Sequence, residues 1–239
     1  MSIREIPSRS DLVHEAYDAI KAAIMAGDLQ PGAYLAQESL AAKLGVSRQP
    51  VSHALMLLRH DGLVVERGRK GQMVAPLDPH HLLSLYQVRG ALDRLAAELT
   101  ATRLARLSEG AAAGPGGGLD GGLGTDLTMM LADGSGAIAS NDIARLVEAD
   151  LAFHRLIYKL SGNPELGEMA DAAWPHMVRS MRVLLTDIEQ RQKAWDDHRR
   201  IVKAILDGDV AEAGNRAAQH AEEAGEATFA CLLEIAKNR

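Results

Sequence analysis

The sequence predicts a mainly α-helical protein in two parts: an N-terminal winged helix-turn-helix of three helices plus a β-hairpin wing, and a C-terminal all-α helical bundle. Apolar residues recur at helical spacing along most of the chain. Two short β-type segments flank the turn sequence "GRKG" in the N-terminal part. An Asp78-Pro79 pair, typical of a helix start, then separates the parts, so we expect domains at residues 1–77 and 78–239.

The N-terminal elements follow in the order helix, helix, turn, helix, hairpin. The first helix is expected to begin near Ser10–Asp11, where both residues can cap it, and to end at Gly27. The segments expected to follow are a helix over "QESLAAKLG", a helix over "RQPVSHALMLLRHDG" with Ser47 as its N-cap, and the strands "LVVER" and "QMVAP". This order is that of a winged helix-turn-helix, in which the third helix reads the major groove of DNA.

The charge of the chain is distributed in a way that suits DNA binding by this first part. The net charge is −6, but residues 1–75 hold 9 Lys and Arg against 8 Asp and Glu, whereas residues 76–239 hold 17 against 24. The expected DNA contacts are Ser47, Arg48, Gln49 and Ser52 at the start of the third helix, and Arg67, Arg69 and Lys70 at the hairpin tip. The alternative is a solvated basic surface on a small helical domain.

The C-terminal part is expected to be helical to its end. The expected helices are "PHHLLSLYQVRGALDRLAAELTATRLARL", "NDIARLVEADLAFHRLIYKLSG", "PELGEMADAAWPHMVRSMRVLLTD" with a break near Pro175, "EQRQKAWDDHRRIVKAILDGD", and a last helix capped by Asp209 with Glu212 as a capping box. Residues 110–124 contain 8 glycines in 15 residues, which predicts a flexible loop, because such a run loses too much chain entropy to form a helix.

Polar groups that can bind a metal lie within the apolar stripes of three of these helices. Asp150 and His154 are four residues apart on one stripe, and His198 and His220 lie on two others. Burying such groups without partners costs about 1–3 kcal/mol for each group, so something must meet them. One Asp and three His can coordinate a divalent ion such as zinc, nickel or manganese and leave positions open for a small ligand. The alternative for each histidine is a hydrogen-bonded residue of the core.

Composition narrows the classes of protein to which this chain can belong. The single Cys231 excludes an internal disulfide framework and a cysteine-rich zinc site. The sequence contains no run of 18 apolar residues and no apolar signal core at its start. We therefore expect a cytoplasmic protein with no membrane partner.

The segment "LAQESLAAKLGVSRQPVSHALMLLRHDGLVVERGRKGQMV" resembles the DNA-binding domain of the GntR family of bacterial transcription regulators, and the match covers about residues 10–76. The family usually has Arg-Glu after the Pro-Val pair, where this chain has Ser52-His53, so an arginine that contacts DNA in the family is absent here. The resemblance implies a homodimer on double-stranded DNA, with one recognition helix for each half of a palindromic operator.

The C-terminal part is similar to the all-helical effector domain called FCD, of the FadR-like subgroup, over roughly residues 80–236. The motifs that carry this resemblance are "DLAFHRLIYKLSGNPEL", "DDHRRIVKAILDGD" and "AAQH". It implies that Asp150, His154, His198 and His220 are metal ligands and that the domain binds a small organic acid. Arg89 and Arg179 are candidates to hold the other end of this carboxylate effector, although Arg89 could also form an ion pair with Asp93, four residues further on.

Together these features predict a DNA-binding transcriptional regulator, acting as a repressor or, less commonly in such families, as an activator, whose metal- and effector-binding domain modulates its operator binding. Two alternatives remain. The metal ion itself could be the signal, or the chain could be a metal-dependent enzyme, because an Asp/His site with open positions can activate water. The enzyme is less favoured, since no obvious general base or nucleophile accompanies the four ligands and the DNA-binding part would have no role.

Overall fold

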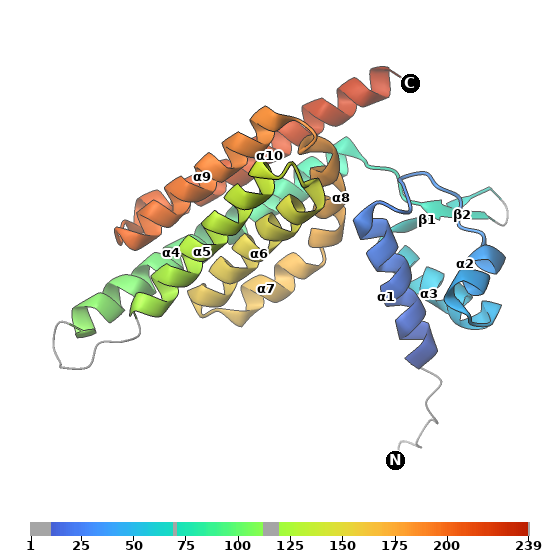
Figure 1. Cartoon of the computed structure of the whole chain (residues 1–239), viewed down its shortest axis with the longest axis horizontal. Helices are drawn as coiled ribbons and strands as arrows, with labels where there is room; N and C mark the ends of the chain where they lie inside the picture. Colours follow the sequence, from blue (N-terminus) through green and yellow to red (C-terminus); the bar gives the residue numbers. More distant parts are fainter. Residues whose placement is uncertain (1–10, 69–70, 112–119, 239) are drawn as a thin grey trace, which may run out of the picture. The chain divides into compact units, whose positions relative to one another are not determined.

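The computed structural model describes residues 11–68, 71–111 and 120–238 (Figure 1). It divides the chain into two compact units, Met1–Leu77 and Asp78–Arg239, and each unit has its own hydrophobic core. The predicted fold class, a winged helix-turn-helix followed by an all-helical domain, is confirmed.

The N-terminal unit is built from three helices and one hairpin. They are α1 (Asp11–Ala26), α2 (Gln37–Leu44), α3 (Arg48–His60), β1 (Val64–Arg67) and β2 (Gly71–Val74). The two strands are antiparallel, with Val64 opposite Val74 and Arg67 opposite Gly71. Tyr34 extends this small sheet through a single bridge to Met73.

Helix α3 is held by an apolar stripe that its sequence makes at helical spacing. Val51, Ala54, Leu55 and Leu58 are completely buried and pack in one core with residues of α1 and β1. The opposite face of α3 therefore remains exposed. Ser47 occupies the predicted N-cap position, but its side chain makes no capping hydrogen bond. The predicted position is therefore right, and the expected hydrogen bond is not formed.

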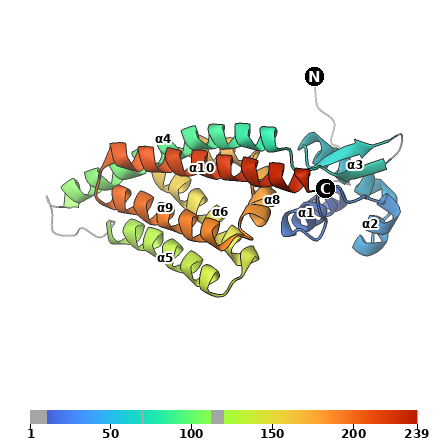
Figure 2. The same ribbon diagram turned by 90° about the horizontal axis from the view of Figure 1, so that it is seen from above.

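The C-terminal unit consists of helices alone in the part that the structure describes. They are α4 (Pro79–Ala111), α5 (Asp120–Ala139), α6 (Ile143–Ser161), α7 (Pro164–Asp171), α8 (Trp174–Leu184), α9 (Ile188–Leu206) and α10 (Val210–Lys237). Helices α4 and α10 come from opposite ends of this unit and lie side by side in both views (Figures 1 and 2). Their close approach requires glycine, since a Cβ at Gly225 would lie 2.7 Å from Cβ of Tyr86.

Side-chain caps fix where several of these helices begin. Asp142, Asn163, Asp187 and Asp209 each accept a hydrogen bond from a backbone N–H in the first turn of α6, α7, α9 and α10, respectively. The predicted Asp209 cap is confirmed by its bond to the N–H of Glu212 at 3.0 Å. The capping box is not formed, because the N–H of Asp209 donates to the carbonyl of Ala204 and the Glu212 carboxylate pairs with Arg216.

The glycine-rich segment differs from its prediction. Helix α4 continues to Ala111 and α5 begins at Asp120, so residues 110–111 and 120–124 are helical rather than part of a loop. Residues 112–119 of that predicted loop lie outside the described residues. The packing of α5 against α6 and α9 stabilises a helix that its glycines would not form alone.

The expected break near Pro175 lies just before this proline, between the end of α7 at Asp171 and the start of α8 at Trp174, and Pro175 occupies the first turn of α8. Over the described ranges, the structure contains no helix that is both long and apolar enough to cross a membrane.

Candidate functional site

The four candidate metal ligands converge in the interior of the C-terminal unit. Asp150 and His154 lie on α6, His198 on α9 and His220 on α10. All four are buried, and each offers one ligand-type atom within 4.8 Å of those of the other three. The structure thus brings together residues that are far apart in the sequence.

The contacts within the cluster join the atoms that would bind an ion. Nε2 of His198 lies 3.3 Å from Nε2 of His220 and 3.4 Å from Oδ1 of Asp150. Nε2 of His154 lies 3.8 Å from Oδ2 of the same carboxylate. Donors at about 2.0–2.2 Å from one ion lie about 3–4 Å from each other, so the cluster has the spacing of a coordination site.

Helix packing positions these side chains. One turn of α6 separates Asp150 from His154, so both point to the same side of the helix. Ala213 and Ala217 are buried on the face of α10 that carries His220, and such small residues let neighbouring helices approach closely. On α9, the ring of His198 stacks on Phe153 with the centroids 4.0 Å apart.

Burial changes the proton affinity of these groups. Desolvation raises the pKa of Asp150 above its ordinary value. Desolvation also lowers the pKa values of His154 and His198 well below the ordinary value, and the nearby Arg89 acts in the same direction. His154 and His198 are therefore neutral near pH 7, which is the form that binds a metal.

Oδ2 of Asp150 is buried and makes no hydrogen bond to the described residues, and this supports a bound cation. A carboxylate oxygen without a donor is costly in a dry interior. A divalent ion bound by this carboxylate would offset that cost, so the residues present fit a metal of the type that accepts His and Asp.

A second set of polar residues, Arg89, Asp93 and Tyr158, lies against the cluster. Arg89 is buried, forms the predicted ion pair with Asp93 at 3.1 Å, and also contacts Nε2 of His154. Its guanidinium lies over the ring of Trp174, 4.9 Å from the centroid. Tyr158 donates a 2.5 Å hydrogen bond to the other oxygen of Asp93, so both carboxylate oxygens have a donor.

A cavity of about 40 Å³ opens beside the cluster. Its polar side includes Arg89, Asp150 and His220, and its apolar side includes Met181 and Leu184. The second predicted effector residue, Arg179, is buried on α8, where desolvation lowers its pKa to about 10. Arg179 is not among the described residues that line this cavity.

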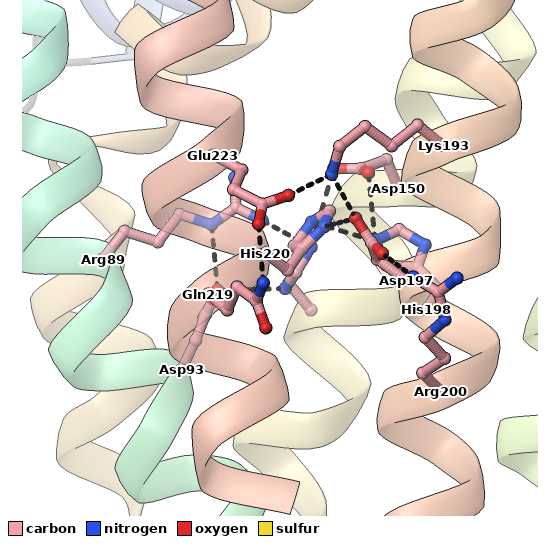
Figure 3. Close-up of polar contacts among 11 residues, drawn as sticks. Arg89, Asp93, Asp150, Lys193, Asp197, His198, Arg200, Gln219, His220 and Glu223 are labelled. Atoms are coloured by element: carbon pink, nitrogen blue, oxygen red, sulfur yellow. Dashed lines mark hydrogen bonds and ion pairs between the residues drawn. The ribbon is translucent and has the colours of Figure 1, made fainter.

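A charged groove of about 380 Å³ lies outside this cavity, between α9 and α10. Lys193, Asp197, His220 and Glu223 line both the groove and the cavity, and Figure 3 shows Lys193 reaching both carboxylates. Lys193 pairs with Asp197 at 2.8 Å and with Glu223. The sequence analysis missed Lys193, Asp197 and Glu223, although the position of Asp197 directly before His198 was a signal for it.

In the N-terminal unit, the predicted DNA contacts lie at the start of α3. Ser47, Arg48 and Gln49 are exposed, and Ser52, one turn further on, is half-buried. An exposed, polar first turn on the third helix is the geometry that reads base edges. In the wing, Arg67 is exposed at the end of β1, while Arg69 and Lys70 lie outside the described residues.

Comparison with known protein families gives two matches. Residues 12–74 match the model of the bacterial regulatory proteins, gntR family, and residues 125–223 match the FCD domain. Among curated relatives, an HTH-type transcriptional regulator of Agrobacterium vitis is 30% identical over 63% of this chain and 81% of its own length. A probable D-xylose utilization operon transcriptional repressor of Paenarthrobacter nicotinovorans is 25% identical over 84% of this chain and 82% of its own length.

Solved structures support the same fold. A GntR regulator from Rhodococcus sp. RHA1 matches with a TM-score of 0.72 at 20% identity, over 91% of this chain and 97% of that one. McbR/YncC of E. coli matches with a TM-score of 0.69 at 20% identity, over 89% of this chain and 94% of that one. At this identity the likeness concerns the fold alone.

Proposed function

We propose a function that follows from the family of this chain, which belongs to the gntR family of bacterial transcription regulators and carries an FCD domain. The protein is a repressor, and a small carboxylate bound at a divalent metal ion modulates its affinity for its operator. The observation that carries this proposal is the buried convergence of Asp150, His154, His198 and His220 beside a cavity that Arg89 also lines.

The metal ion would be held by one carboxylate oxygen and three imidazole nitrogens. This donor set suits zinc, nickel and manganese. A divalent ion with one aspartate leaves a net charge of about +1 at the centre, which attracts an anion. When bound, the ion would supply open coordination positions that a carboxylate can fill.

The cavity supports a ligand with an acidic end and an apolar body. Arg89 lies on its polar side, and Met181 and Leu184 lie on its apolar side. The cavity holds only a few water molecules at about 40 Å³, so a ligand of several carbon atoms requires the lining side chains to move. A ligand that binds one arrangement of these helices more tightly shifts the protein toward it.

On DNA, the exposed first turn of α3 would enter the major groove and the wing would contact the backbone or the minor groove. Arg48 can pair with a guanine through two hydrogen bonds, and Gln49 with an adenine. A homodimer would present two such helices to the halves of a palindromic operator. Ligand binding would then change the spacing or orientation of the two helices.

Operator release measured at fixed metal content tests this proposal. DNA fragments selected by the wild-type protein from a random pool would be bound to zinc-loaded protein and titrated with citrate, malate and benzoate. Release by a carboxylate, lost in Asp150→Ala/His198→Ala, supports the proposal. In a parallel titration of metal-free protein, release of the operator by zinc alone would make the protein a metal sensor. Consumption of the carboxylate would make it an enzyme, and each of these outcomes would overturn the proposal.

A further inference from the structure

Two of the three clustered histidines have a carboxylate behind the ring. Nδ1 of His154 lies 3.4 Å from Oδ2 of Asp93, and Nδ1 of His220 lies 3.7 Å from Oδ2 of Asp197. In both cases the carboxylate faces the nitrogen that points away from the centre of the cluster. The other nitrogen of each ring, Nε2, faces the remaining ligands.

The surroundings of His154 determine which of its nitrogens carries a proton. Arg89 can only donate hydrogen bonds, and its Nη2 contacts Nε2 of His154. This nitrogen is therefore unprotonated in the neutral ring, and the proton is on Nδ1, toward Asp93. Asp93 is held in place by the Nε of Arg89 at 3.1 Å and by Tyr158 at 2.5 Å.

Two cationic side chains of α9 hold the carboxylate behind His220. Asp197 accepts hydrogen bonds from Lys193 at 2.8 Å and from Arg200 at 2.9 Å (Figure 3). These two cations hold the carboxylate on the Nδ1 side of His220, with its Oδ2 3.7 Å from that nitrogen, where it can accept the proton of the ring.

His198 differs from the other two. Its Nδ1 is buried and makes no hydrogen bond to any described residue. On the Nδ1 side no carboxylate of the described chain lies behind this ring, which instead stacks on Phe153. Two of the three histidines thus have a carboxylate at Nδ1 and the third does not, so His198 serves as a comparison within the same site.

We propose that Asp93 and Asp197 are positioning residues for the metal centre: each accepts the Nδ1 proton of its histidine, fixes the ring orientation and keeps Nε2 unprotonated, which is the form that binds an ion. This inference rests on the proposed metal binding. A carboxylate partner makes the imidazole a stronger ligand, and its loss typically weakens metal binding by about 10–100-fold. Asp197 is the better test, because its side chain borders the groove, whereas Asp93 is buried against Arg89.

The experiment compares the zinc affinity of the full chain with that of Asp197→Asn, Asp197→Glu and Asp196→Asn, by competition with a chromophoric chelator. Asp196 is the neighbouring exposed carboxylate, paired with Arg199, and serves as the matched control. We expect Asp197→Asn to bind zinc about 10–100-fold more weakly, with Asp197→Glu recovering part of the loss and Asp196→Asn unchanged. Thermal unfolding without metal would check that the variants are folded.

Nitrogen-15 NMR of the histidine rings in zinc-loaded protein gives a second readout that a purely structural role would not change. We expect Nδ1 of His220 to carry the proton in the wild type, and Asp197→Asn to weaken or shift that signal. Wild-type affinity and an unchanged signal in Asp197→Asn would overturn the inference while leaving metal binding intact. A wild-type protein that binds no zinc would overturn both.

Discussion

Asp150 and His198 belong to different helices, yet Oδ1 of Asp150 lies 3.4 Å from Nε2 of His198 inside the C-terminal unit. Oδ2 of Asp150 is also buried and makes no hydrogen bond to the described part of the chain. Such an atom is unusual, because buried polar groups are nearly always paired. A cation bound between α6 and α9 would give it a partner.

Metal content is the first expected consequence. Protein purified without an affinity tag or chelator should contain about one divalent ion per chain, since one set of donors converges. Elemental analysis by plasma mass spectrometry would measure it. Asp150→Ala/His198→Ala should lose the ion, whereas the control His60→Ala, on an exposed side chain of the N-terminal unit, should retain it. Equal metal content in the three proteins would show that the ion is bound elsewhere.

The stability of metal-free protein should fall in mild acid. Burial lowers the folded-state pKa values of His154 and His198 below the ordinary value of 6.5. Below this pH the unfolded chain binds more protons than the folded one, so the free energy of unfolding decreases as pH falls. Each histidine contributes a slope of up to about 1.4 kcal/mol per pH unit.

Urea unfolding between about pH 7.5 and 5 would measure this slope. The variant His198→Gln should show a shallower decrease than the wild type. A matched control is His60→Gln, because His60 has an exposed side chain. The explanation would be wrong if His198→Gln and the wild type lost stability in parallel.

The sequence predicts the cluster and Arg89 beside it, but not the contacts between α9 and α10, for a physical reason. Asp150 and His154 stand out within a single apolar stripe, because helical periodicity is a local property. The contact of Asp197 with His220, and that of Lys193 with Glu223, depend on how α9 packs on α10, which no local pattern specifies. The same applies to α5, where packing outweighs the low helix propensity of glycine.

Gly134 shows what that packing requires. A Cβ at this position of α5 would lie 1.5 Å from a ring carbon of Trp195, whose Nε1 donates to the carbonyl of Leu131. Gly134→Ala should therefore lower the free energy of unfolding by about 1–3 kcal/mol through overpacking. Chemical denaturation would measure the difference.

Gly136 provides the matched control on the same helix. A Cβ there meets its nearest atom, on Arg145, at 3.7 Å, which is ordinary contact. Gly136→Ala should stabilise the protein by about 0.5–1 kcal/mol, because alanine loses less conformational freedom than glycine in a helix. Equal effects of the two substitutions would contradict the packing of α5 on Trp195.

Arg48 tests the DNA-binding surface. It is exposed in the first turn of α3, where a side chain can reach a base edge in the major groove. Arg48→Ala should weaken binding to the selected operator by about 1–3 kcal/mol and relax its sequence preference at one position of each half-site. Fluorescence anisotropy at fixed salt, with the operator and a scrambled duplex, would measure both effects.

The control Arg94→Ala removes the same charge from α4, where Arg94 bonds to Asn215, and should leave DNA binding unchanged. Loss of affinity for both duplexes alike in Arg48→Ala would show that this residue contacts only the phosphate backbone, and an unchanged affinity would exclude it from the interface.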